Sequence, residues 1–344
     1  MKSNLGFGFT FGAIGLVIAL FLAIAMISGF ERLPIQTAQG GYRGTGIDEI
    51  YNPRTLARLH AANVVPASLP QLPASGPKAG AVYKNVKVLG DLSVGEFTRL
   101  MASITTWVAP TQGCAYCHNT ANMADDGLYT KVVARRMIQM TQHVNADWKQ
   151  HVAATGVTCF TCHRGNPVPS QTWFSAQDQT HGALQADPGK NLVAPAAGDS
   201  SLPGDPFTPF LKDAANIRVQ ATTALPQGDA ATIKNADWTY ALMMHMSSAL
   251  GVNCTYCHNT RSFGDWSQST PQRVTAWYGI RMVRDLNADY LGPLTATFPQ
   301  ARRGPGGDVA KVNCATCHQG VYKPLFGVGM AAGFPELQAP SGGH

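Results

Sequence analysis

One short pattern, Cys-x-x-Cys-His, occurs four times in this chain of 344 residues. Two thiols separated by two residues can add to the two vinyl groups of one porphyrin, and the adjacent imidazole can then bind the iron. The pattern is the attachment signal of a c-type haem, so the sequence predicts four covalently bound haem c groups. The predicted attachment residues are Cys114, Cys117, Cys159, Cys162, Cys254, Cys257, Cys314 and Cys317, and the predicted proximal iron ligands are His118, His163, His258 and His318.

The four copies use all eight cysteines of the chain, which leaves no thiol for a disulfide. Two structural zinc sites are the main alternative, but they leave the four adjacent histidines unexplained. Covalent haem attachment in bacteria takes place outside the cytoplasmic membrane, so the haem-bearing part is expected in the periplasm. Nucleic acid is not an expected partner, because the haem propionates outweigh the formal charge of +6 and no run of Lys or Arg is present.

An uncharged run from Gly6 to Phe30 is long enough to span a bilayer as a helix. Lys2 precedes the run and Glu31-Arg32 close it. Lys2 and the amino terminus give a positive-inside signal that favours a cytoplasmic N-terminus. A cleaved signal peptide is the alternative, but the apolar core of such peptides is only about 7–15 residues long. We therefore expect an uncleaved anchor in the bacterial inner membrane, cytoplasmic or intracytoplasmic, with the haem domain on the periplasmic side.

The rest of the chain divides by composition and by the positions of the motifs. After the anchor at 1–32, residues 33–90 are rich in Pro and Gly and are expected to form an extended arm. Residues 91–175 hold the first two motifs, 176–232 are expected to be a linker, and 233–344 hold the last two motifs and an irregular tail. The predicted fold class is mainly α with much irregular coil.

Apolar residues at helical spacing predict a helix before each motif. These helices are Val94–Val108, Leu128–Val152, Trp238–Leu250 and Gln272–Tyr290. The motifs also resemble one another in alternation, since the first and third read Cys-x-Tyr-Cys-His-Asn-Thr and the second and fourth share Thr-Cys-His. The run beginning at Asn145 matches the run beginning at Asn287. The chain therefore looks like two duplicated two-haem halves, which suggests a pseudo-twofold arrangement.

The sixth iron ligands are expected from the helices that lead into the motifs. Met101, Met137 and Met243 precede the first three motifs, and a Met ligand raises the potential of a haem relative to a second His. Met on a helix is more often core filler than ligand, and other candidates stay open: Met140 for haem 2 and Met244 or Met246 for haem 3. The position that matches Met137 in the second half is Gly279, so haem 4 needs a ligand from elsewhere.

With these features the chain resembles the tetrahaem cytochrome subunit of the photosynthetic reaction centre of purple bacteria. The resemblance covers nearly everything from the anchor to haem 4. It implies that Met101, Met137, Met243 and His151 are the sixth ligands of haems 1, 2, 3 and 4. It also implies a near-linear haem row in which haem 3 lies nearest the special pair, followed by haem 4, haem 2 and haem 1.

The resemblance further implies an electron carrier rather than an enzyme. Its expected partners are the membrane-spanning reaction-centre subunits that carry bacteriochlorophyll and a soluble periplasmic donor, either a cytochrome c or a high-potential iron-sulfur protein. The expected role is to pass electrons from that donor to the photo-oxidised special pair.

The sequence adds its own reasons for His151. It lies eight residues before Cys159, where the resemblance places this ligand. It also lies 14 residues after Met137, about four turns of an α-helix. A continuous helix would therefore place Met137 and His151 on one face, where they could serve the neighbouring haems 2 and 4. His143 is the competing candidate.

Two rival functions stay open at this stage. A membrane-anchored tetrahaem quinol dehydrogenase would favour bis-His ligation, and a multihaem reductase would need one iron without a sixth ligand. Six histidines lie outside the motifs, which is enough for bis-His ligation on paper: His60, His143, His151, His181, His245 and His344.

The four motifs make a direct prediction about mass. After acid and organic extraction, the intact protein should exceed the mass of the polypeptide by four haem units. A gain of three units or fewer, measured by mass spectrometry, would contradict it.

Overall fold

The computed structural model of the chain describes residues 5–29, 36–39, 48–175, 193–217, 219 and 233–338. Most of its regular structure is helical, in agreement with the predicted fold class, and its strands form two antiparallel pairs. The α-helices are α1 Leu5–Gly29, α2 Pro53–Ala62, α3 Ala79–Val82, α4 Val94–Val108, α5 Tyr129–Asp147, α6 Lys149–Val152, α7 Cys159–His163, α8 Ile233–Leu250, α9 Pro271–Asp285 and α10 Cys314–His318.

Short helical turns of other types connect these helices, and the strands are short. The 3-10 turns are η1 Gly113–Tyr116, η2 Pro195–Ala197, η5 Cys254–Tyr256, η7 Gly292–Ala296, η8 Gln300–Arg302, η9 Pro324–Gly327, η10 Met330–Gly333 and η11 Pro335–Leu337. The π-helical turns are η3 Thr208–Lys212 and η6 Leu286–Leu291. The strands are β1 Gln36–Gln39 paired with β2 Asp48–Tyr51, and β3 Thr172–Trp173 paired with β4 Lys311–Val312.

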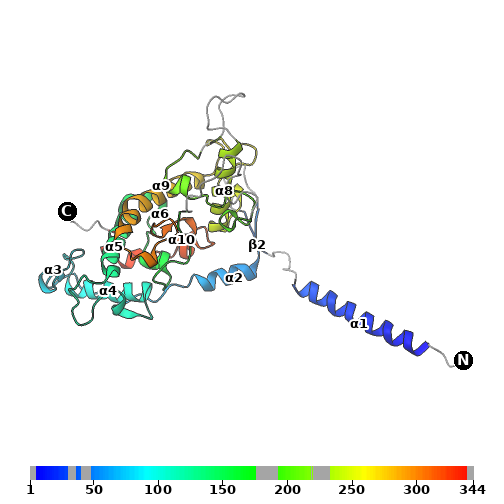
Figure 1. Cartoon of the computed structure of the whole chain (residues 1–344), viewed down its shortest axis with the longest axis horizontal. Helices are drawn as coiled ribbons and strands as arrows, with labels where there is room; N and C mark the ends of the chain where they lie inside the picture. Colours follow the sequence, from blue (N-terminus) through cyan, green and yellow to red (C-terminus); the bar gives the residue numbers. More distant parts are fainter. Residues whose placement is uncertain are drawn as a thin grey trace.

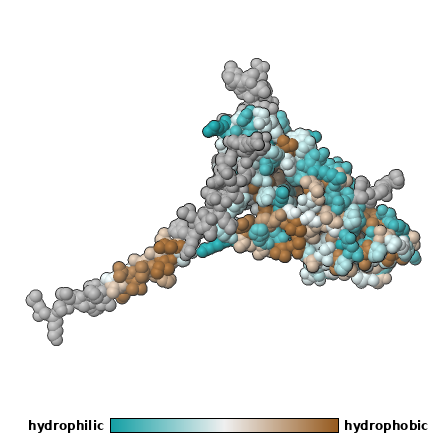
Figure 2. Space-filling view, turned by 180° about the vertical axis from the view of Figure 1, so that it is seen from behind, coloured by the Kyte–Doolittle hydropathy of each residue, from teal (hydrophilic) through white to brown (hydrophobic). Residues whose placement is uncertain are grey.

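Helix α1 covers the predicted anchor and stands apart from the rest of the chain (Figure 1). Its Phe11–Ser28 stretch is long and apolar enough to cross a membrane, and none of that stretch is buried against the protein. Figure 2 shows it as an almost continuous apolar rod. Apolar side chains that find no partner within the chain need another apolar environment, so α1 fits a membrane anchor.

The arm at 33–90 contains more regular structure than its composition predicts. It holds the β1–β2 pair and the helix α2, so the expectation of extended coil throughout is wrong. Asn52 caps α2 by accepting a hydrogen bond from the backbone N–H of Arg54, and Pro53 occupies the first helical position, where its missing N–H costs nothing. Local capping therefore outweighs the general Pro and Gly content.

Helix α4 has the predicted bounds because its N-terminus carries a capping box. Ser93 accepts from the N–H of Glu96, and the Glu96 carboxylate accepts from the N–H of Ser93. This reciprocal pair satisfies two backbone donors that a helix start otherwise leaves free.

The predicted continuous helix Leu128–Val152 is broken, so the argument that one helix face carries both Met137 and His151 is wrong. Helix α5 ends at Asp147, and Trp148 leaves helical geometry with φ −109° and ψ 32°. The Trp148 indole donates a 2.7 Å hydrogen bond to the Asp285 carboxylate of α9. The one-turn helix α6, Lys149–Val152, which carries His151, follows this break.

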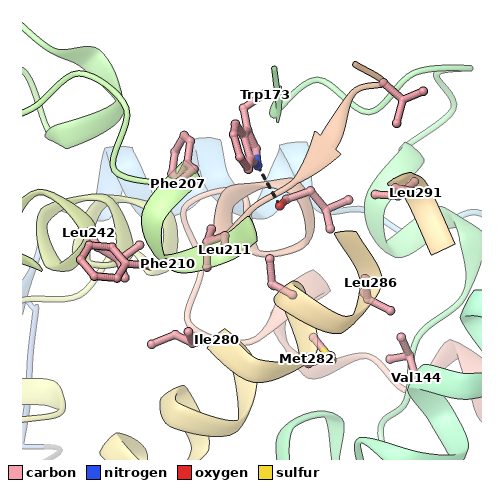
Figure 3. Packing of buried hydrophobic residues seen from close by; sticks show 13 residues of the cluster. Val144, Trp173, Phe207, Phe210, Leu211, Leu242, Ile280, Met282, Leu286 and Leu291 are labelled. Atoms are coloured by element: carbon pink, nitrogen blue, oxygen red, sulfur yellow. Dashed lines mark hydrogen bonds between the residues drawn. The ribbon is translucent and has the colours of Figure 1, made fainter. Parts of the chain in front are cut away.

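The largest hydrophobic cluster draws on both haem-bearing segments and on the predicted linker. Figure 3 shows Val144 of α5 near Met282 and Leu286, while Phe207, Phe210 and Leu211 come from the part of the linker at 193–217. The Trp173 indole closes one side by donating to the Val312 carbonyl at 3.0 Å. This part of the linker is therefore a buried component of the core.

A second hydrophobic cluster fixes the tail against the first half of the chain. Phe334 and Leu337 are almost fully buried and pack with Leu100 and Trp107 of α4. The Arg99 guanidinium crosses the same region, where it donates to the Gly333 carbonyl. The tail is irregular, as predicted, but it belongs to the core.

A polar junction joins α5 to α9 beside the broken helix. The His143 imidazole lies between two carboxylates, 2.7 Å from Asp147 and 2.5 Å from Asp285. Tyr290 stacks on His143 with ring centroids 5.2 Å apart. Burial disfavours the charged imidazole, but the hydrogen bonds to Asp285 and Asp147 outweigh it and raise the pKa of His143 above its ordinary value.

This junction predicts a pH dependence of stability. Because folding raises the His143 pKa, its stabilising contribution is complete below about pH 6.5 and is lost as pH rises through the folded-state pKa. The decline of Tm over that interval should become shallower in His143→Gln. Asn166→Ala is the control, since it removes an exposed side chain that does not titrate, and it should keep the parent's slope. Equal slopes in the parent and His143→Gln would contradict this account.

Candidate haem sites

The four motifs adopt two local conformations, which alternate along the chain. The first and third lie in or beside the 3-10 turns η1 and η5, and the second and fourth form the one-turn helices α7 and α10. In each α-helical copy the backbone N–H of the N-cap residue, Thr158 or Asn313, donates to the hydroxyl of the threonine three positions later, at 3.0 and 2.9 Å. The same local hydrogen bonds therefore shape both.

Each motif imidazole is held by a backbone carbonyl a few residues further on. His118 and His258 donate from Nδ1 to carbonyls five residues later, at 3.4 and 3.0 Å. His163 and His318 donate from Nδ1 to carbonyls three residues later, at 2.9 and 3.0 Å. A carbonyl can only accept, so the proton lies on Nδ1 and the Nε2 lone pair is left for a metal. This is the arrangement usual for metal-binding histidine.

Burial keeps the site groups uncharged. It lowers the pKa of His163 and His258, and together with the nearby His151 it lowers the pKa of His318 to about 4. A neutral imidazole is the form that binds iron. Burial also raises the pKa of the Cys159 thiol to about 11 and that of Cys314 to about 12.

The rival zinc interpretation requires about four Cys or His ligands around one ion. Within the described ranges, no group of three or more His, Cys, Asp or Glu side chains is arranged to hold a metal ion.

The second and fourth motifs lie against each other. The Arg164 guanidinium donates to the Cys317 carbonyl, and the Gln319 amide donates to the Cys162 carbonyl, both at 3.4 Å. The sulfur atoms of Cys162 and Cys317 are paired as a disulfide. This pairing differs from the expectation that all eight thiols carry haem, since one sulfur cannot form a disulfide and a thioether together.

His151 lies beside the fourth motif. Its ring centroid is 6.0 Å from that of His318, with the two planes at 68°. Its Nδ1 donates to the Thr275 carbonyl of α9 at 2.9 Å. Burial lowers the pKa of His151, so this imidazole is also neutral, with Nε2 available. Figure 1 shows α6, α9 and α10 grouped in the middle of the molecule.

The competing candidate His143 is already engaged. Both its ring nitrogens contact carboxylates, as described above, and the Trp148 indole lies 3.2 Å from its Nε2. No ring nitrogen of His143 is left for iron, whereas His151 has one.

The three predicted Met ligands lie partly buried on the expected helices. Met101 is on α4, which contacts η1, and Met137 is on α5, which contacts α7. Met243 is on α8, eleven residues before Cys254. Of the competitors, Met244 packs over Gly198, where an added Cβ would lie 3.2 Å from its terminal methyl. Met140 and Met246 pack against the larger core cluster, as Met137 and Met243 also do.

Two basic residues that sequence reasoning missed fix the loops after the first and third motifs. The Lys131 ammonium donates to the Met123 carbonyl, which also accepts from His118. At the matching place, Arg273 donates to the Asp265 carbonyl and the Ser269 hydroxyl. Lys131 and Arg273 are 142 residues apart, the same separation as that between Asn145 and Asn287. Extending the repeat alignment could therefore have found them.

Matching asparagines brace the segments that lead into the second and fourth motifs. The Asn145 side chain exchanges two hydrogen bonds with the backbone of Val157 and donates a third to the Leu337 carbonyl. Asn287 makes the same exchange with Val312 and donates to the Leu211 carbonyl. Each of these valines directly precedes the N-cap of its motif helix.

Comparison with known proteins agrees with this geometry. The family model for the photosynthetic reaction centre cytochrome c subunit matches residues 31–338. The chain belongs to this family. The photosynthetic reaction center cytochrome c subunit of Rubrivivax gelatinosus is 59% identical over 92% of this chain and 87% of its own length. Those of Thermochromatium tepidum and Roseobacter denitrificans are 51% and 40% identical, over 92% and 95% of this chain and 79% and 91% of their own lengths.

As a reaction-centre cytochrome c subunit, the protein is an electron carrier with covalently bound haem c and not an enzyme. Membership also implies association with the reaction-centre core. The apolar α1 fits membrane association.

The matched asparagines generate a prediction. Asn145→Ala and Asn287→Ala should each reduce the free energy of unfolding by about 2–3 kcal/mol, because each leaves buried backbone groups without partners. Asn166→Ala is the control: this exposed side chain donates only to the Arg164 carbonyl at 3.3 Å, and the backbone carbonyl that holds His163 is kept. Unfolding can be followed by the loss of the low-spin haem spectrum. If the free energy of unfolding falls no more in Asn145→Ala and Asn287→Ala than in the control, the proposed bracing role is wrong.

Proposed function

We propose that this chain is the periplasmic electron-transfer subunit of a photosynthetic reaction centre, carrying four haem c groups. It would pass electrons from a soluble donor to the photo-oxidised bacteriochlorophyll special pair. The observation that carries the proposal is the set of four motif imidazoles, each fixed through Nδ1 with Nε2 free. Four such imidazoles in one member of this family provide four haem sites in one relay.

The residues present fit four haems. The eight motif cysteines would form the thioethers, and His118, His163, His258 and His318 would be the proximal ligands. We assign Met101, Met137, Met243 and His151 as the sixth ligands of haems 1, 2, 3 and 4. When bound, each haem supplies a one-electron iron couple whose potential its axial ligands set.

We infer that residues 91–175 and 233–344 are duplicated halves related by a pseudo-twofold axis. In a twofold contact, residue i meets residue j of the other half while j meets i. The Arg164–Cys317 and Gln319–Cys162 hydrogen bonds form such a reciprocal pair, and His143 meets Asp285, its counterpart 142 residues later. Haems 2 and 4 would then be neighbours across this axis.

The close approach of Cys162 and Cys317 supports this neighbour relation. In the haem-loaded chain we propose that these two sulfurs carry adjacent thioethers in place of the disulfide. Helix α1 would anchor the chain in the inner membrane, with the haems on the periplasmic side. The donor would be a soluble cytochrome c or a high-potential iron-sulfur protein.

The quinol dehydrogenase alternative would need several spare histidines placed beside motif histidines. His60 stacks on Phe326 with ring centroids 3.8 Å apart, and His143 is held by carboxylates. His181 and His344 lie outside the described residues. His245 is buried against Phe207, with ring centroids 4.6 Å apart. His151 is the described spare histidine whose ring contacts that of a motif histidine, so we propose one bis-His site, formed by His318 and His151.

A flash experiment tests the relay. After a flash given to intact membranes, the pigment cation should decay while c-type haem becomes oxidised, because the haem row would be its electron source. Selective chemical oxidation of the haems beforehand is the control and should slow the decay. Recovery of the pigment at the normal rate with no haem oxidation would overturn the proposal.

Replacement of the sixth ligand tests haem 4. In His151→Met, one haem of the four should shift to a higher midpoint potential, since Met raises the potential relative to His. The matched control His143→Met should leave all four potentials in place. If His143→Met moves one haem and His151→Met moves none, His143 is the ligand.

A further inference from the structure

We infer that Gly279 determines which kind of ligand haem 4 receives, because the absence of a side chain at this position in α9 makes room for the imidazole of His151. The inference rests on the proposed role of His151 and deepens it. Gly279 would be a positioning residue, since it acts on the iron only through His151.

The distances make the requirement steric. A Cβ placed on Gly279 would lie 2.5 Å from Cε1, 2.8 Å from Nδ1 and 3.1 Å from Nε2 of His151. Carbon atoms in contact are normally about 3.5–4.0 Å apart. All three close contacts are ring atoms of one imidazole, so even the smallest side chain would displace the ring that faces His318.

The imidazole has little freedom to move away. Its Nδ1 is bonded to the Thr275 carbonyl, which lies one helical turn before Gly279 on the same helix. The His318 ring of α10 lies 6.0 Å away, centroid to centroid. Helix α9 therefore supplies both a hydrogen-bond acceptor and an open space, and the ring is fixed between α9 and α10.

The helix gives up stability at this position. Gly279 is buried in the interior of α9, where glycine is less favourable than alanine. Its backbone does not have the positive φ that would otherwise require glycine. The contacts explain the glycine at this position by the space that the His151 ring occupies.

The matching position in the other half shows the contrast. Met137 occupies this place on α5, 142 residues earlier, and we assign it as a ligand. Helix α5 thus contributes a ligand, Met137, from its own side chain. Its counterpart α9 instead leaves space for His151, a ligand from the other half. The difference at this single pair of positions would make haem 4 bis-His and haem 2 His/Met.

The test compares glycine substitutions in the purified holoprotein. Gly279→Ala should alter the low-spin electron paramagnetic resonance signal and the midpoint potential of one haem of the four. Gly95→Ala is the matched control on α4, where an added Cβ would make only an ordinary 3.4 Å contact with Leu72, and it should change none. Four unchanged haems in Gly279→Ala, with a raised Tm from its better helix propensity, would overturn the inference.

Double variants keep the test decisive if the single variant does not fold. Gly279→Ala should lower the Tm of the parent protein, because the added Cβ clashes with the His151 ring. In a His151→Gly background the ring is gone, and Gly279→Ala should not lower Tm. His151→Gly combined with Gly279→Met should convert the altered haem to His/Met ligation with a raised potential. An equal loss of Tm in both backgrounds would assign Gly279 to helix packing alone and overturn the inference.

The single variant His151→Gly separates this inference from the proposal beneath it. If His151→Gly changes no haem, the ligand assignment fails and the inference fails with it. If His151→Gly changes one haem while Gly279→Ala changes none, only the inference fails.

Discussion

A hydrogen bond from the Nδ1 of each motif histidine to a nearby backbone carbonyl is the interaction on which the account depends. It fixes the tautomer and directs Nε2 away from the backbone, and burial keeps His163, His258 and His318 neutral. An Nδ1–H held by a carbonyl leaves Nε2 as the atom that can bind a metal, which supports the proposal of a haem iron at each of the four sites. The loops and caps around the motifs serve largely to hold those carbonyls in place.

The two haem-bearing segments cannot be separated without losing this arrangement. His151 comes from the first segment and lies beside His318 and Gly279 of the second, while Arg164 and Gln319 donate to the motif carbonyls of the opposite segment. Such contacts bring the second and fourth motifs together. A row of haems needs that closeness, because electrons must pass from one to the next.

Local sequence signals predicted what depends on local structure. The four motifs, the capped helix α4 and the anchor α1 each follow from a short stretch of residues. The break at Trp148 could not be predicted, because it depends on Asp285, 137 residues away. The burial of Phe207 and Leu211 in a Pro- and Gly-rich linker and the pairing of Cys162 with Cys317 likewise depend on long-range packing. His151 was found through the repeat and the family resemblance, although the helix invoked to support it is broken.

The most direct test of the account is an anomalous-scattering map, recorded at the iron edge, of crystals of the complete haem-loaded complex. The account predicts four iron peaks, one at the Nε2 of each motif histidine. The peak beside His318 should also lie next to His151, and Cys162 and Cys317 should each be bonded to a porphyrin. Fewer than four peaks, or a fourth iron bound by a residue other than His151 while Cys162 and Cys317 stay joined, would contradict it.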